Sequence, residues 1–293
     1  MRSGMTTVVG RPNVGKSSLV NALVGQKVSI VSRRPQTTRH RIHGVRNREG
    51  VQIVFVDTPG LHEREQRELN RVLNRAATGA IEGVDVVLHV VESGQWRSDD
   101  DLALARAKAS GLPVVAALNK VDRQADKSKL LPELAALGAR YDYADIVPVS
   151  ATHGDNLDTL ADVLAGFMPE GPALFPPDQI QGHDLAFTIA ECVREKLTRM
   201  LHQELPYALS VGVEMLEDSE GLLRTRAVIW VEREAQKKIV IGAGGETAKR
   251  VGTSARRELE RQLGKKVYLQ THVRVRANWS DDPAALRALG YEG

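Results

Sequence analysis

The chain of 293 residues has a single cysteine and no long run of apolar residues. Cys192 has no second cysteine to pair with, so an intrachain disulfide is excluded. No apolar segment reaches the roughly 20 residues that a membrane-spanning helix needs. The first residues lack the apolar core of a secretory leader. We therefore expect a cytoplasmic protein without a cleaved signal peptide, for which membrane contact is confined to the inner surface.

Internal repeats and low-complexity tracts are also lacking, and the composition is that of a globular protein. Hydrophobic residues make up 42% and charged residues 26%, with a formal net charge of +3. The charge is unevenly distributed, because residues 221–276 contain 14 lysines and arginines but only 5 acidic residues. This surplus of nine positive charges fits either a solvated basic face or a nucleic-acid surface.

Short apolar runs alternate with helical patterns over residues 5–168. The candidate strands are residues 6–9, 51–56, 84–91, 113–118 and 146–149, and the candidate helices after the first are residues 64–79, 98–110, 127–138 and 155–167. Nearly continuous apolar runs are typical of strands that are buried on both faces. The pattern predicts an α/β fold with a mostly parallel sheet and helices on both sides.

The pattern changes at a proline-rich segment, residues 168–177, which cannot continue a helix. Beyond it we expect a helix, two strands, a helix, a strand and a short helical tail. The approximate ranges of the first five are 183–202, 206–217, 222–233, 244–263 and 266–277. We therefore predict a first domain over residues 1–169, a linker over 170–180 and an α+β second domain over 181–293.

The clearest motif is Gly10-Arg11-Pro12-Asn13-Val14-Gly15-Lys16-Ser17, which reads G-x-x-x-x-G-K-S between a strand and a helix. In this phosphate-binding loop, backbone N–H groups and a helix N-terminus face the phosphate oxygens. Lys16 supplies a positive charge and Ser17 a hydroxyl ligand for Mg²⁺. The expected phosphate-binding residues are Gly10, Asn13, Val14, Gly15, Lys16, Ser17 and Ser18.

A second motif, Asp57-Thr58-Pro59-Gly60, follows the strand that ends at residue 56. An aspartate at this position can hold Mg²⁺ through water, and the N–H of Gly60 can sense a γ-phosphate. Thr38, in the loop of residues 33–42, is the expected third Mg²⁺ ligand beside Ser17 and Asp57. A plain solvated loop is the alternative for that stretch.

The motif Asn119-Lys120-Val121-Asp122 follows the strand that ends at residue 118 and selects the base. The Asp122 carboxylate can accept from N1–H and the 2-amino group of guanine, which adenine does not offer. Asn119 is expected at the ring edge, with the stem of Lys120 over the ring. Ser150-Ala151 follows the last strand, where a backbone N–H can reach guanine O6. The predicted ligands are therefore GTP or GDP with Mg²⁺.

Two residues bear on hydrolysis besides Lys16 and Thr38. Leu61 stands directly after the D-x-x-G motif, where many GTPases carry a glutamine that orients water, so we expect a low intrinsic rate. The amide oxygen of Asn13 is a candidate K⁺ ligand near the β–γ bridge, and a structural turn residue is the alternative.

The second domain contains a G-x-x-G loop, Gly242-Ala243-Gly244-Gly245, before a basic helix. This loop looks like that of a KH domain, which clamps the backbone of single-stranded RNA. The expected RNA-binding residues are Lys237, Lys238, Gly242, Ala243, Gly244, Gly245, Lys249 and Arg250.

The order of these motifs, from a P-loop GTPase through a proline-rich linker to a KH-like (type II) domain, resembles the Era GTPase family. The loop of residues 36–41 and the ending of residues 278–283 add to the resemblance. It implies a GTP-hydrolysing switch that binds small-subunit ribosomal RNA near its 3′ end, acts in small ribosomal subunit maturation, works as a monomer and does not bind DNA.

Ala243 departs from the basic or polar residue that relatives tend to carry, which shifts the expected phosphate contacts to Lys237, Lys238 and Lys249. The alternative is a GTP-gated module whose basic domain binds protein or an anionic membrane.

Overall fold

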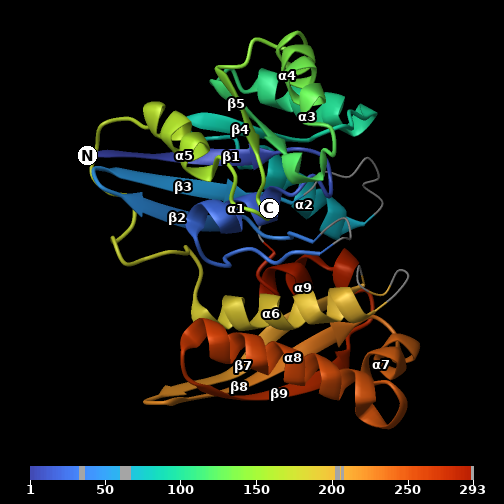
Figure 1. Cartoon of the computed structure of the whole chain (residues 1–293). Helices are drawn as coiled ribbons and strands as arrows, with labels where there is room; N and C mark the ends of the chain where they lie inside the picture. The colour runs from blue at the N-terminus through green and yellow to red at the C-terminus, as the bar shows by residue number, and fades with distance from the viewer. Residues whose placement is uncertain (33–36, 60–66, 202–204, 206–207, 292–293) are drawn as a thin grey trace. The chain divides into compact units, whose positions relative to one another are not determined.

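The computed structural model describes residues 1–32, 37–59, 67–201, 205 and 208–291. The chain divides into two compact units (Figure 1). Most of the first unit comes from residues 1–31, 38–59 and 73–182. The second contains residue 183 onwards, together with Ser32, Thr37 and residues 67–72. The predicted pairing of an α/β unit with an α+β unit is confirmed.

The first unit is built on a six-stranded sheet of order β2-β3-β1-β4-β5-β6. Its strands are β1 (Arg2–Val9), β2 (Ile42–Arg48), β3 (Val51–Asp57), β4 (Val86–Glu92), β5 (Val114–Asn119) and β6 (Asp145–Val149). Only β2 runs antiparallel to its neighbour, so the sheet is mostly parallel, as predicted. The sequence prediction did not include β2, which is more polar than the central strands.

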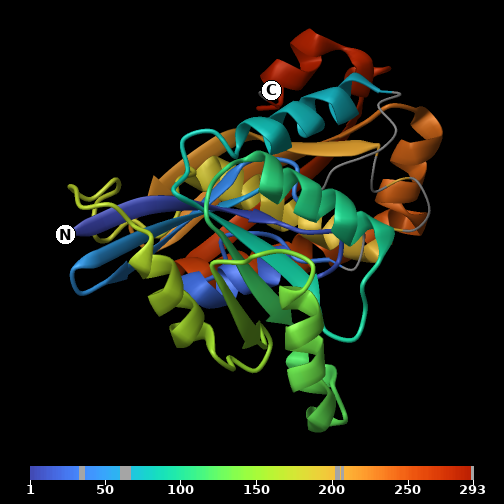
Figure 2. The same cartoon turned by 90° about the horizontal axis from the view of Figure 1, so that it is seen from above.

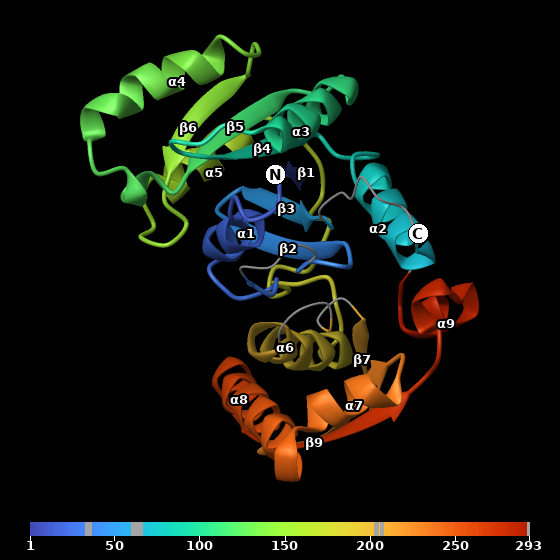
Figure 3. The same ribbon diagram turned by 90° about the vertical axis from the view of Figure 1, so that its right-hand side faces the viewer.

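Helices cover both faces of this sheet. The helices are α1 (Lys16–Val24), α2 (Glu68–Gly79), α3 (Ser98–Ala109), α4 (Leu130–Gly138) and α5 (Leu157–Gly166). On one face α1 and α5 lie next to each other (Figure 2), where Leu19 and Leu160 pack with Phe55 in a fully buried core. Figure 3 shows α3 beside β4 and α4 beside β6. Because both faces are covered, the central strands carry continuous apolar sequence.

The proline-rich segment lies along β2 and β3 and is fixed by hydrogen bonds. The buried carboxamide of Gln52 accepts from the N–H groups of Leu174 (2.8 Å) and Phe175 (2.9 Å) and donates to the Phe175 carbonyl (2.8 Å). Val45 N–H donates to the Ile180 carbonyl at 2.8 Å. The predicted linker is therefore held against the first unit, where it pairs with groups at the open edge of the sheet.

The second unit packs helices on one face of a three-stranded sheet of order β7-β8-β9. Its elements are α6 (Leu185–Met200), β7 (Leu209–Ser219), β8 (Leu222–Val231), α7 (Glu234–Ile241), α8 (Glu246–Leu263), β9 (Lys266–Val275) and α9 (Pro283–Ala288). β7 and β8 are antiparallel, whereas β8 and β9 are parallel. Figure 1 shows α6 and α8 side by side over the sheet. The sequence prediction missed α7 but had the remaining order right.

Two smaller expectations concern buried groups and the membrane. Cys192 is buried among the apolar residues of the second core, as expected for a structural cysteine. Among the described residues, no helix is both long enough and apolar enough to cross a bilayer.

Candidate functional site

The predicted phosphate loop connects β1 to the N-terminus of α1. Gly15 has φ = 104° directly before α1 begins at Lys16. A β-carbon at Gly15 would lie 2.4 Å from the side-chain nitrogen of Asn119. Glycine is therefore required both for the backbone angle and for space. The result is a helix N-terminus whose free N–H groups face the loop, which is the arrangement that binds phosphate.

Lys16 lies folded across this loop. Its Nζ donates to the carbonyls of Gly10 (2.7 Å) and Arg11 (2.9 Å). Burial lowers the pKa of Lys16 to about 8, because the charged form loses hydration. A phosphate oxygen is a stronger partner for this ammonium than a neutral carbonyl is.

The three predicted Mg²⁺ ligands come together from α1, the segment before β2, and the end of β3. Ser17 Oγ donates to Asp57 Oδ2 at 2.7 Å and lies 3.1 Å from Thr38 Oγ1, which donates to the same carboxylate oxygen at 3.2 Å. Burial raises the pKa of Asp57, with hydrogen bonds from Ser17 and Thr38 opposing the rise. Asp57 Oδ1 is buried and accepts no hydrogen bond from the described residues. Two hydroxyls and a carboxylate with one free oxygen fit a hard cation such as Mg²⁺.

The base motif lies at the carboxyl end of β5. Asn119 Nδ2 donates to the Val14 carbonyl at 2.9 Å, and Asn119 Oδ1 accepts from Ala151 N–H at 3.2 Å. The Asn119 side chain thus joins the phosphate loop to the Ser150-Ala151 segment, and its contact with the ring edge stays a prediction. Ser150 Oγ donates to Asp122 Oδ1 at 2.7 Å and lowers the pKa of that carboxyl. Asp122 is therefore held as an anion, as guanine recognition requires.

Sequence reasoning missed an ion-pair network beside the phosphate loop. Arg11 pairs with Glu92 at 2.7 Å and with Asp100 at 2.9 Å, and Lys120 pairs with Glu92 at 2.7 Å. Burial acts to raise the pKa of Glu92, but the bonds from Lys120 and Arg11 outweigh it and lower that pKa. Lys120 also donates to the Asn13 carbonyl at 2.7 Å. The sequence feature that could have indicated this network is the position of Glu92 at the carboxyl end of a parallel strand, because ligand sites of parallel sheets lie at that end.

Among the remaining predicted site residues, the structure describes Asn13 and Ser18 but not Gly60 and Leu61. Asn13 is exposed at the turn of the loop with φ = 65°, a conformation that asparagine tolerates better than most residues. Ser18 lies in the first turn of α1, next to Ser17. Gly60 and Leu61 lie outside the described residues, so their predicted roles are not placed.

In the second unit, the G-x-x-G loop connects α7 to α8. Gly242 has φ = 76°, and a β-carbon there would lie 2.3 Å from Thr247 Oγ1, so only glycine fits. Ala243 and Gly244 are exposed at the tip, and Lys249 and Arg250 are exposed in the first turns of α8. Lys237 and Lys238 lie on α7, with Lys238 the more exposed of the two.

The lowered pKa of Lys16 gives a pH prediction. Without nucleotide, we expect the Lys16 ammonium to titrate near pH 8, well below an ordinary lysine, whereas bound phosphate should keep it protonated above about pH 9. Nucleotide binding should accordingly take up a proton between these two values. The chemical shift of its labelled Cε, identified by its loss in Lys16→Arg, measures both pKa values. Titration of free Lys16 near that of an ordinary lysine, at about pH 10, would contradict the prediction.

Comparison with known proteins finds a matching family for each of the two units. Residues 5–120 match the family described as 50S ribosome-binding GTPase, and residues 204–280 match the KH domain family. The chain is 52% identical over 291 residues to the GTPase Era of Xanthomonas axonopodis pv. citri, covering 99% of this chain and 97% of that protein. It is 51% identical over 289 residues to the GTPase Era of Stenotrophomonas maltophilia, with the same coverage.

Two solved structures resemble the whole chain. One is a variant of the Aquifex aeolicus Era bound to GDP and AlF4⁻, and the other is an Era in complex with MgGDPNP and nucleotides 1506–1542 of 16S ribosomal RNA. Each has a TM-score of 0.94 and 36% sequence identity, and covers 100% of both chains. With the motifs, both domains and near-complete alignment in agreement, the chain belongs to the Era family of GTPases.

Proposed function

We propose that the chain is a GTP-hydrolysing switch that binds small-subunit ribosomal RNA near its 3′ end and assists assembly of the small ribosomal subunit. The GTP-dependent part of this proposal is supported by Asn119, whose side chain holds the phosphate loop and the guanine motif together through two hydrogen bonds. The RNA-binding part is supported by the relative solved with a 16S ribosomal RNA segment. The family that matches residues 5–120 is described as 50S ribosome-binding, whereas 16S RNA belongs to the small subunit. We propose the small subunit because the relative solved with 16S RNA is similar over the whole chain.

The phosphate end of the site performs binding and charge stabilisation. Backbone N–H groups around Gly15 and the N-terminus of α1 bind phosphate oxygens, and Lys16 exchanges its two carbonyl partners for them. Ser17 and Thr38 would hold Mg²⁺ through their hydroxyls and Asp57 through water, and the metal supplies positive charge beside the phosphates. Leu61 cannot orient water by a hydrogen bond, which favours a low intrinsic rate of hydrolysis.

The base end selects guanine through Asp122. We expect Asp122→Asn to weaken GTP binding at least about a hundredfold, because two hydrogen bonds to a charged acceptor are lost. The same variant should bind xanthosine triphosphate more tightly than the wild type does, because its amide can donate to the 2-oxo group. Fluorescence titration with both nucleotides measures this exchange. Asp126→Asn, an exposed aspartate in the next loop, is the matched control and should change neither affinity. An Asp122→Asn variant that keeps its preference for GTP would contradict the role.

Asn13 is proposed as a K⁺ ligand that adds positive charge near the β–γ bridge. Its exposed amide at the tip of the phosphate loop is free to turn toward a bound triphosphate. Hydrolysis should be faster in K⁺ than in Na⁺ at equal ionic strength, and Asn13→Ala should remove the difference. The turn conformation itself is the rival explanation, and Asn13→Gly, which suits positive φ but lacks the amide, separates the two. Equal rates of the wild type in both salts would exclude the K⁺ role.

RNA binding is proposed for the G-x-x-G loop and the basic residues around it. Glycines at the loop allow phosphates to approach the backbone, and the N-terminus of α8 favours the anion. Lys237, Lys238, Lys249 and Arg250 add positive charge on either side of the loop.

The test is filter binding to RNA of the 16S segment 1506–1542 named in the solved relative. Gly245→Asp places a negative charge in the loop at a position where a β-carbon meets nothing within 4 Å. Because Gly245 has φ = 81°, Gly245→Asn, which shares the backbone strain but carries no charge, is the matched control. We expect Gly245→Asp to lose RNA binding at least tenfold while binding GDP normally. If the wild type binds anionic vesicles or protein but not this RNA, the alternative of an interaction module is favoured.

The proposed setting follows from these activities. We place the protein in the cytoplasm as a monomer that binds the small ribosomal subunit. Binding of the wild type to anionic vesicles would add contact with the inner surface of the membrane.

A further inference from the structure

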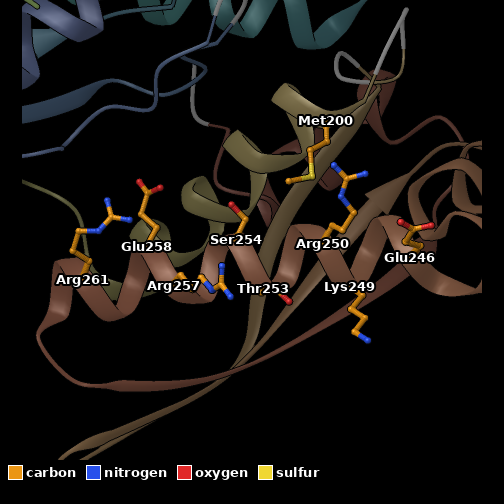
Figure 4. Close-up of a pocket in the computed structure, with 9 residues that line it drawn as sticks. All are labelled: Met200, Glu246, Lys249, Arg250, Thr253, Ser254, Arg257, Glu258 and Arg261. Carbon is orange, nitrogen blue, oxygen red and sulfur yellow. The ribbon is translucent and has the colours of Figure 1, made fainter.

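A cavity of about 410 Å³ opens on the outer side of α8, next to the end of α6 (Figure 4). Four of its lining residues are cations, two carry carboxylates, and the rest are small, hydroxylic or apolar. The lining consists of Met200, Glu246, Lys249, Arg250, Thr253, Ser254, Arg257, Glu258 and Arg261. Eight of these nine come from one helix, so the cavity follows the length of α8.

The cavity lies on a different flank of α8 from the one that meets the sheet edge. Glu258, which lines it, pairs with Lys196 of α6. On the other flank, a β-carbon at Gly252 would lie 3.8 Å from Thr271 Oγ1 of β9. A third, buried face carries Val251, together with Ala255 and Leu259. The cavity therefore begins beside the G-x-x-G loop, at Glu246 and Arg250, and continues along α8 to Arg261 on a flank other than the one that meets β9.

Three arginines of the lining are available to a ligand. Arg250, Arg257 and Arg261 are exposed, and no described residue forms an ion pair or hydrogen bond with their guanidinium groups. At about 1.5 Å per residue, they extend over roughly 16 Å of the helix axis. Of the two carboxylates, Glu258 pairs with Lys196, which also pairs with Glu195. The cavity thus presents a line of free positive charge with hydroxyls between its members.

We propose that this face of α8 is a second RNA-binding surface, a track for the phosphodiester backbone of a strand that continues beyond the G-x-x-G loop. The proposal rests on RNA binding by the second unit, as proposed above. The line of arginines is too long for one small anion and suits several linked phosphates. Guanidinium groups bind phosphate through two parallel N–H donors, and Ser254 supplies a further donor. An anionic membrane fits less well, because Met200 is the single large apolar residue of the lining and is itself half-buried.

The experiment compares RNAs of different length. Fluorescence anisotropy first identifies the tightest-binding hexamer of the 1506–1542 segment, which is long enough for the four nucleotides that a G-x-x-G loop clamps. The hexamer is then extended by ten nucleotides on either its 5′ or its 3′ side. The test variant is Arg257→Glu/Arg261→Glu, with Arg257→Gln/Arg261→Gln as a milder form. The matched control is Arg224→Glu/Lys266→Glu, which makes the same charge change on exposed positions of β8 and β9.

The wild type should bind one of the two extended RNAs more tightly than it binds the hexamer. The test variant should bind that extended RNA at least tenfold more weakly than the wild type, with the hexamer affinity unchanged within twofold. The salt dependence should fall by about 1.4 in the slope of log affinity against log salt, since each lost phosphate contact on a single strand contributes roughly 0.7. The control should lose less than threefold on either RNA. A circular dichroism spectrum and a melting temperature like those of the wild type show that the second unit of each variant is folded, since GDP binding reports on the first unit alone.

Several outcomes would overturn the track while leaving RNA binding by the loop intact. These are a wild type that gains nothing from either extension, a test variant that loses hexamer and extended RNA equally, and a control that loses as much as the test variant. A test variant that loses binding to phosphatidylserine vesicles but not to RNA would make the face a membrane surface. A wild type that binds no RNA at all would instead refute the proposed function itself.

Discussion

The close approach of the Asn119 carboxamide to the phosphate loop determines the geometry of the nucleotide site. The amide donates to the Val14 carbonyl and accepts from Ala151 N–H, and the residue as a whole is 1% exposed. A buried polar group that loses its partner costs about 1–3 kcal/mol, so both bonds are strongly maintained. The approach is possible only because Gly15 has no β-carbon. One contact therefore sets the distance between the phosphate-binding loop and the base-binding edge of the sheet.

The charges around that contact leave Lys16 as the cation available to phosphate. Arg11 and Lys120, the neighbouring cations, are matched by Glu92 and Asp100. Lys16, in contrast, has hydrogen bonds only to neutral carbonyls among the bonds that the described residues form with it. Paired charges add little net field, whereas a cation with neutral partners retains most of its attraction for an anion. The network therefore shapes the loop without competing for the ligand.

Sequence alone predicted most of this site because its residues follow buried strands. Asp57, Asn119 and Ser150 each come at or just after the carboxyl end of a β-strand that an apolar run identified. Such ends meet at one edge of a parallel sheet, so their proximity follows from topology. Glu92 occupies the same kind of position but belongs to no recognised motif. Its role depends on Arg11, which only the folded chain brings near.

The two missed elements have identifiable physical causes. β2 is an edge strand whose polar residues bind backbone carbonyls of segments distant in the sequence: Arg46 donates to the Leu23 carbonyl, and Asn47 donates to the Pro177 carbonyl. Alternation and apolar runs do not detect such a strand. α7 is a helix of eight residues that ends in Ile239-Val240-Ile241, which favours extended structure by intrinsic preference. Its end at Gly242, with φ = 76°, and its packing against α8 override that preference.

The charge of the second unit shows why composition cannot locate a binding surface. The surplus of nine positive charges over residues 221–276 includes several cations whose acidic partners lie outside that range. Lys265 pairs with Asp218, Arg274 with Glu214 and Arg276 with Asp282. Strand pairing and the turn after β9 bring these partners together, so no count along the chain separates neutralised from free cations. The arginines that line the α8 cavity have no such partner among the described residues, and cations of that kind can hold phosphates over the length of a nucleic-acid strand.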